Sequence, residues 1–174
     1  MNKVNKLVIS AACVALAFLA SKIKLFELPL GGSVTLMSML IITLPAYFYG
    51  LKFGIFSTIC FSLLKFIFAG NIYHPVQALL DYGFAYVCFF VAGFDSIRKN
   101  KNGLTIGYVL GCLLRVIFSA MSGYIFFKEY TPEAWNPIIY VFVYNGAYIF
   151  AEMVISIIII NIPFVKQNLK KLLT

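Results

Sequence analysis

Long stretches of apolar residues follow one another along this chain, separated by short segments that carry glycine, proline or charged residues. A helix that spans the hydrocarbon core of a bilayer needs about 20 mostly apolar residues. Six stretches approach this length, and we predict a membrane-spanning helix for each: residues 5–24, 33–50, 52–70, 76–94, 104–127 and 138–162. The connections are too short to hold a soluble domain. The pattern therefore predicts a single domain over residues 1–174, an all-α polytopic membrane bundle of six helices.

The composition supports this interpretation. Hydrophobic residues make up 62% of the chain and charged residues 11%, whereas soluble domains carry about 25% charged residues. These values exclude a soluble enzyme, and an aromatic content of 17% excludes a disordered chain. A signal peptide is an alternative for the first stretch, since Lys3 and Lys6 precede it. We favour a span there because the run is long and further spans follow it.

The net charge of +8 is distributed in a way that predicts orientation. Basic residues lie between the apolar stretches, which is typical of the positive-inside rule and not of nucleic-acid binding. With six spans, both termini share one side of the membrane with the second and fourth connections. That side carries Lys3, Lys6, Lys52, Arg98, Lys99, Lys101, Lys166, Lys170 and Lys171, against Lys22, Lys24, Lys65 and Lys128 on the other. We therefore expect both termini in the cytoplasm.

Among the ionisable residues inside predicted spans, three stand out, namely Asp81, Arg115 and Glu152. A charge at that depth costs several kcal/mol and usually marks function or pairing. Arg115 and Glu152 lie at similar depths on consecutive helices, so we predict a structural ion pair between them. Asp81 has no basic residue near its depth and indicates a cationic partner or a proton.

Other polar residues fall in the same outer layer as Asp81. At about 1.5 Å per helical residue, Asp81 lies about 9 Å below the outer surface, and Ser119 and Ser122 lie about 12 and 8 Å below it. The fourth span adds His74 and Gln77 on the face of Asp81, and the sixth adds the stripe Tyr140, Tyr144 and Tyr148, with Asn145 beside it. A cavity open to the outside would explain this layer. Ordinary hydrogen bonding between helices remains an alternative, above all for the serines.

Catalytic signatures are missing from the sequence. No motif for a metal-dependent hydrolase, a serine nucleophile or a phosphate-binding loop occurs. The four cysteines lie in apolar stretches without metal-ligand spacing, and His74, the only histidine, precedes Pro75, where a turn or cap role is the default. We expect no enzymatic activity, no cofactor and no metal, so that any ATP-driven step belongs to a partner.

Ala11 and Ala15 form a small-x-x-x-small pair on the first span. Such pairs let helices approach closely. The pattern alone leaves two interpretations open, namely packing inside this bundle or docking of another subunit.

Several stretches, taken in order, resemble one known family. They are residues 30–36 (LGGSVTL), 49–54 (YGLKFG), 74–82 (HPVQALLDY), Arg115, 122–127 (SGYIFF) and 140–146 (YVFVYNG). Together they resemble the thiamine-specific substrate-binding subunit, or S component, of energy-coupling factor vitamin transporters. The resemblance implies a multi-pass subunit of a prokaryotic cell membrane that binds thiamine from outside. It also implies docking on a transmembrane scaffold subunit that is driven by two cytoplasmic ATPases.

The resemblance also implies roles for particular residues. The family's binding positions fall on Asp81, Tyr82, Gly123, Phe127, Tyr140 and Asn145, to which the pocket face adds Ser119 and Tyr144. Gly31 and Gly32 fall in the connection that forms a mobile lid, and Ala11 and Ala15 match the scaffold contact. An acid suits the thiazolium cation, aromatic faces suit both rings of thiamine, and an asparagine can donate to and accept from a pyrimidine edge.

The chain departs from the family at Ser119, where we would align a histidine. A hydroxyl group is smaller than an imidazole and offers no stacking surface. A thiamine analogue, a precursor or another vitamin therefore stays open as the ligand. A membrane scaffold protein without any small ligand is the alternative from a different class.

Overall fold

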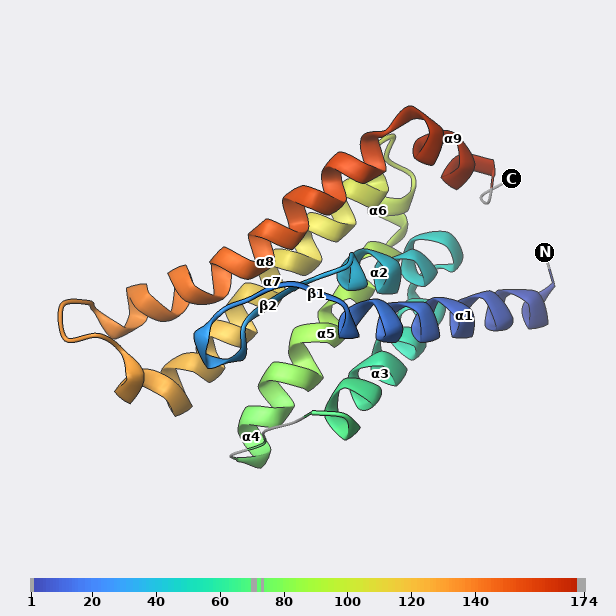
Figure 1. The fold of residues 1–174 in the computed structure, drawn as a ribbon. Helices are drawn as coiled ribbons and strands as arrows, with labels where there is room; N and C mark the ends of the chain where they lie inside the picture. The colour runs from blue at the N-terminus through green and yellow to red at the C-terminus, as the bar shows by residue number, and fades with distance from the viewer. Residues whose placement is uncertain (1, 70–71, 73, 172–174) are drawn as a thin grey trace.

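The computed structural model describes residues 2–69, 72 and 74–171 of the chain. It is mostly helical (Figure 1). The helices and strands are α1 Lys3–Lys22, β1 Lys24–Glu27, η1 Pro29–Gly31, β2 Ser33–Thr35, α2 Ser38–Tyr49, α3 Leu51–Ile67, α4 Pro75–Ala78, η2 Leu79–Phe84, α5 Ala85–Val87, η3 Cys88–Gly93, α6 Asp95–Arg98, α7 Gly103–Phe127, η4 Lys128–Tyr130, α8 Pro137–Asn161 and α9 Pro163–Lys171.

Four helical segments in the described part of the chain are long and apolar enough to cross a membrane. They are Lys3–Lys22, Pro75–Gly93, Gly103–Tyr130 and Pro137–Asn161, and they correspond to the first, fourth, fifth and sixth predicted spans. The second predicted span is shorter than we expected. Residues 33–35 form a strand, and α2 has only 12 residues, which corresponds to about 18 Å. The third stretch forms α3, with 17 residues.

The connection between α1 and α2 folds as a β-hairpin, a short two-stranded addition to a mostly helical chain that the sequence pattern did not predict. Strands β1 and β2 pair antiparallel, with Phe26 opposite Val34 and Glu27 opposite Ser33. The turn between them holds the short helix η1, in which Gly31 has a φ of +91° and so takes a conformation that glycine adopts at little cost. Strand β2 of the hairpin packs on α8.

The fourth span is one helical rod whose pitch changes along its length. It begins at His74, whose Nδ1 accepts a hydrogen bond from the Val76 amide at 3.2 Å, so the predicted cap role is confirmed. After α4 the backbone widens into the π-helical turn η2, and it ends in the 3₁₀ segment η3. Asp81 and Tyr82 lie in the π turn, a geometry that is frequent at functional sites.

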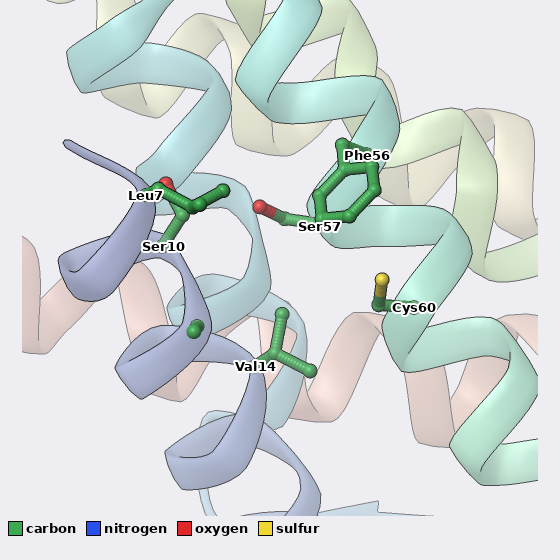
Figure 2. A pocket seen from close by; sticks show the side chains of 7 residues that line it. Leu7, Ser10, Val14, Phe56, Ser57 and Cys60 are labelled. Carbon is green, nitrogen blue, oxygen red and sulfur yellow. The ribbon is translucent and has the colours of Figure 1, made fainter. Parts of the chain in front are cut away.

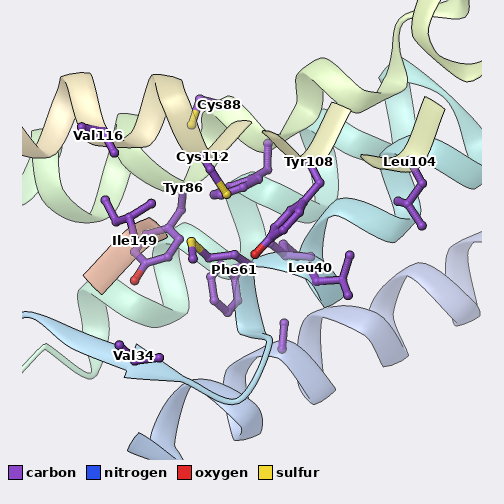
Figure 3. Close-up of a cluster of buried hydrophobic side chains, with 14 of the residues drawn as sticks. Val34, Leu40, Phe61, Tyr86, Cys88, Leu104, Tyr108, Cys112, Val116 and Ile149 are labelled. Atoms are coloured by element: carbon purple, nitrogen blue, oxygen red, sulfur yellow. The ribbon is translucent and has the colours of Figure 1, made fainter. Parts of the chain in front are cut away.

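The core lies between α7, α8, η3, α2 and α3, where α7 packs on α8, η3 and α2, and α3 packs on η3 from the other side. Tyr108, Phe61, Phe89 and Ile149 are fully buried there (Figure 3). A Cβ atom at Gly111 would lie 2.4 Å from the Phe89 ring, so the missing side chain allows α7 to approach η3. Large apolar side chains on the outer faces of the long helices stay exposed, as expected for helices that contact lipid.

Candidate functional site

The tyrosine stripe on α8 is continuous in three dimensions. Successive ring centroids from Tyr140 to Tyr144 and from Tyr144 to Tyr148 are both 6.1 Å apart, the first pair stacked and the second edge-on. Trp135, in the connection before α8, meets Tyr140 edge-on at 6.2 Å. This arrangement extends the aromatic surface from the connection between α7 and α8 towards the middle of α8.

Asn145 lies beside the stripe and is buried. Its Nδ2 donates to the Val141 carbonyl at 2.9 Å, and its Oδ1 accepts from the Tyr148 hydroxyl at 2.8 Å. Gly123 of α7 faces it, because a Cβ atom there would lie 3.3 Å from the Asn145 Nδ2. The structure thus brings Gly123, Tyr144 and Asn145 together at the contact between α7 and α8.

Asp81 is partly buried in the π turn and has few partners. Its Oδ2 accepts a 3.3 Å hydrogen bond from the Gln77 amide, and Ser122 and Arg115 of α7 lie close to the carboxylate. The ion pairs among the described residues are Lys24–Glu27 and Asp95–Arg98, both at the surface. Asp81 forms no ion pair within this part of the chain.

Three further predicted binding residues, Ser119, Tyr82 and Phe127, lie on α7 and η2. Ser119 is buried and lies beside the Tyr148 side chain. Tyr82 is partly buried next to Asp81, and its carbonyl accepts a hydrogen bond from Ser62 of α3. Phe127, also partly buried, ends α7 with its ring 6.2 Å from Tyr130.

The predicted ion pair between Arg115 and Glu152 is wrong. The Arg115 guanidinium lies over the Tyr86 ring, with its Cζ 4.3 Å from the centroid, and its Nη2 donates to the Tyr86 hydroxyl at 2.9 Å. The Tyr148 ring lies 6.0 Å from the same Cζ. The groups in direct contact with this buried cation are therefore aromatic faces and a phenol oxygen, and it forms no salt bridge with Glu152.

Glu152 instead binds the segment that joins the hairpin to α2. Its Oε2 accepts from the Thr35 amide at 2.9 Å and from the Thr35 hydroxyl at 2.6 Å. Its Oε1 accepts from the Met39 amide at 3.1 Å. The sequence analysis missed this contact, because Glu152 and Thr35 are 117 residues apart and depth in the membrane does not reveal such a partner.

The predicted lid residues lie against the tyrosine stripe. The Gly32 amide donates to the Tyr144 hydroxyl at 3.0 Å, and that hydroxyl in turn donates to the Pro29 carbonyl. Gly32 also touches Tyr148, since a Cβ atom there would lie 2.6 Å from its Cδ1. In this structure the tip of the hairpin is therefore closed on α8, whereas Gly31 contacts nothing within 4 Å of its Cβ position.

Ala11 and Ala15 lie apart from these residues, on the exposed face of α1. Buried residues of α1, such as Ser10, Val14 and Ala17, face the bundle instead. Ala11 lines a cavity of about 130 Å³ between α1 and α3, together with Val14, Ser57 and Cys60 (Figure 2). Neither α1 nor α3 carries a predicted ligand-binding residue.

The chain is similar in sequence to the proteins of one known family. The sequence model of the thiamine transporter protein family (Thia_YuaJ) matches residues 7–172. A protein of Bacillus subtilis called thiamine transporter ThiT is 32% identical over 151 residues, which cover 79% of this chain and 78% of that protein. A thiamine transporter ThiT of Lacticaseibacillus paracasei is 24% identical over 68% of this chain and 62% of that protein.

A solved structure shares the fold. ThiT from Listeria monocytogenes superposes with a TM-score of 0.80 and 22% identity, over 98% of both chains. The apolar helices and these relatives indicate a multi-pass membrane protein with a role in thiamine transport. On the extent of the family match and the identity to the Bacillus protein, this chain belongs to the thiamine transporter family.

Proposed function

We propose that this protein is the substrate-binding subunit of an energy-coupling factor importer and that it captures thiamine from outside the cell. The observation that carries the proposal is Asp81, a carboxylate at membrane depth with no ion-pair partner among the described residues. It lies next to Ser122 and Arg115 of α7, and Arg115 in turn lies near Tyr148, the last tyrosine of the stripe on α8. A site of this kind suits a flat ligand with a fixed positive charge.

Each part of thiamine finds a chemical counterpart in this layer. The thiazolium ring is permanently cationic, and its attraction to Asp81 is strong where water is excluded. The rings of Tyr140 and Tyr144 offer faces for stacking and for cation–π contact. Asn145 presents a donor and an acceptor. Its amide now bonds within α8, so binding a pyrimidine edge would exchange those partners.

We propose six membrane crossings with both termini in the cytoplasm of a prokaryotic cell. The four long segments, α2 and α3 supply the crossings, although α2 is short. The start of α1 and α9 lie at the same end of the molecule, opposite the connection between α7 and α8 (Figure 1). This arrangement agrees with the distribution of lysine and arginine along the sequence.

We also propose that α1 docks on a transmembrane scaffold subunit that two cytoplasmic ATPases energise. Ala11 and Ala15 are exposed in the isolated chain, which favours contact with a partner over packing inside the bundle. The smallest side chains allow the closest approach of a second helix.

The identity of the ligand rests on Ser119. This side chain is buried beside Tyr148, at the position where the family would place an imidazole. A thiamine analogue or precursor is therefore the second candidate ligand. Mass spectrometry of small molecules that copurify with the protein would identify the compound directly.

Replacement of Asp81 by asparagine tests the binding site. We expect Asp81→Asn to weaken thiamine binding about 30- to 4,000-fold, because losing one partner of a desolvated charge pair costs about 2–5 kcal/mol. Fluorescence of Trp135, the only tryptophan, reports binding because it adjoins Tyr140. Asp95→Asn is the matched control, since Asp95 is exposed and pairs with Arg98.

The proposal predicts saturable quenching by thiamine in the wild type and in Asp95→Asn. Equal affinity in Asp81→Asn would show that Asp81 is structural. No response of the wild type to thiamine or to related vitamins would favour the scaffold protein without a ligand.

A further inference from the structure

Glu152 binds the hairpin more firmly than any other side chain of α8 does. It is 1% exposed, and three short hydrogen bonds reach its carboxylate from Thr35 and Met39. The Ser38 hydroxyl lies 2.7 Å from the Thr35 hydroxyl and adds to this hydrogen-bond network. We propose that Glu152 is a positioning residue that fixes the base of the hairpin and thereby sets where its tip closes over the binding site.

The carboxylate bridges a sharp bend in the backbone. Met37 has a φ of +55°, a left-handed conformation that is uncommon for a residue other than glycine and persists only where its surroundings enforce it. Glu152 accepts amide hydrogen bonds from both sides of this residue, at Thr35 and at Met39. It thus holds the angle between β2 and α2.

The same carboxylate stabilises the start of α2. The first amides of a helix lack partners within the helix, and the helix dipole favours a negative charge there. Met37 precedes α2 without capping it through its own side chain, and the Met39 amide is satisfied by Glu152 instead. The charge of Glu152 therefore needs no cation, which explains why Arg115 is not its partner.

The residues that hold the hairpin form one line on α8. Tyr144, Tyr148 and Glu152 are spaced four residues apart and lie on one helix face, over about 12 Å of helix. Tyr144 and Tyr148 contact the tip at Gly32, and Glu152 contacts the base at Thr35. Three residues of extended chain cover about 10 Å, so β2 matches the distance between the two contacts.

The contacts of α8 with the base of the hairpin are stronger than its contacts with the tip. At the tip, one partly buried tyrosine hydroxyl serves both Pro29 and Gly32. At the base, a buried ionised acceptor takes several hydrogen bonds, and hydrogen bonds to charged groups are about twice as strong as neutral ones. Opening for ligand entry would therefore release the tip first, while the base at Glu152 stays in place.

Glu152→Gln tests this role, which rests on the proposed function. An amide replaces one acceptor oxygen with a donor that faces the donors of Thr35 or Met39. We expect hydrogen–deuterium exchange of the purified protein in detergent to rise in peptides that cover residues 24–39 and to stay unchanged in α7. Thiamine should dissociate about 10- to 100-fold faster, on the scale of a lost hydrogen bond to a charged group.

Two further variants keep the test decisive. Thr35→Val removes only the hydroxyl donor and should give the same changes at a smaller scale, even if Glu152→Gln fails to fold. Ser156→Ala, one turn further along α8 at a fully buried position, should alter neither exchange in the hairpin nor thiamine dissociation.

The outcomes separate this inference from the proposed function. Unchanged exchange in Glu152→Gln and Thr35→Val would overturn it, as would faster exchange with unaltered ligand affinity. Loss of affinity without a change in exchange would also overturn it, because Glu152 would then act on the ligand and not on the hairpin. If the wild type does not bind thiamine, the proposed function is wrong. The exchange data would still test whether Glu152 fixes the hairpin.

Discussion

Gly32 offers the most direct test of whether the hairpin must close on α8 for binding. Its φ of −61° and ψ of 131° are ordinary for any residue, so Gly32→Ala adds a methyl group without straining the backbone. That methyl group would lie 2.6 Å from Tyr148 Cδ1, 2.8 Å from Tyr148 Cε1 and 2.9 Å from the Tyr144 hydroxyl. These distances are well inside van der Waals contact, so one partner must move.

The hairpin, not Tyr148, is the partner expected to move. Tyr148 is buried, donates a hydrogen bond to Asn145 and lies against the Arg115 guanidinium. The hairpin tip is held by the hydroxyl of Tyr144 and lies at the surface. Overpacking of this kind costs about 1–3 kcal/mol. If closure accompanies binding, this cost lowers the affinity for thiamine about 5- to 150-fold.

Titration of the Trp135 fluorescence with thiamine and stopped-flow dissociation would measure the effect. We expect the dissociation rate of Gly32→Ala to rise and its melting temperature in detergent to change little, because the core is untouched. Leu25→Ala, on the exposed face of the same hairpin, is the control and should bind as the wild type does. An affinity of Gly32→Ala within twofold of the wild type would refute the reasoning that closure contributes to binding.

Three other substitutions test separate parts of the proposal. The double substitution Ala11→Leu with Ala15→Leu should abolish thiamine uptake by cells that express the partner subunits, yet spare thiamine binding. Ala12→Leu, on the adjacent face of α1, is the control. A joint loss of binding and uptake would mean that Ala11 and Ala15 pack against other helices of this protein. Ser119→His should raise thiamine affinity about 2- to 12-fold through one added aromatic contact. If Ser119→His loses thiamine binding and the wild type binds a different compound, the assignment of thiamine as the substrate is wrong. Tyr86→Phe should cost about 1–3 kcal/mol of stability, because the buried guanidinium group on α7 loses its phenol acceptor; an unchanged melting temperature would contradict this.

The sequence predicted the longest helices well. The fifth and sixth stretches match α7 and α8 to within one residue at each end, because long apolar runs between charged or turn-forming segments leave little freedom. The second stretch failed for a physical reason. Residues 33–37 are as compatible with a strand as with a helix, and hydropathy over a short run does not distinguish them. Pairing with β1 decides the outcome, and this contact is not visible in the local pattern.

Helical spacing predicted neighbours within one helix of the candidate site, but it did not predict contacts between distant segments. Spacing along one helix placed Gln77 beside Asp81 and aligned the tyrosines of α8, as observed. The ion pair of Arg115 failed because equal depth does not fix which way two side chains point around their helices. The hairpin and the start of α2 supply the hydrogen bonds of Glu152, and no apolar pattern predicted the hairpin.

Asp81, Arg115 and Glu152, which lie inside the spans, differ in their partners, and the difference supports the proposed position of the ligand charge. Glu152 is surrounded by amide and hydroxyl donors of the hairpin and α2, and Arg115 by the rings and hydroxyl of α5 and α8 tyrosines. Asp81 has one long hydrogen bond from Gln77 and remains partly exposed. A carboxylate can accept about four hydrogen bonds, so Asp81 keeps acceptor capacity that the Glu152 carboxylate has largely used. A cation that enters from outside would therefore gain most at Asp81, which is where the proposed function places the thiazolium ring.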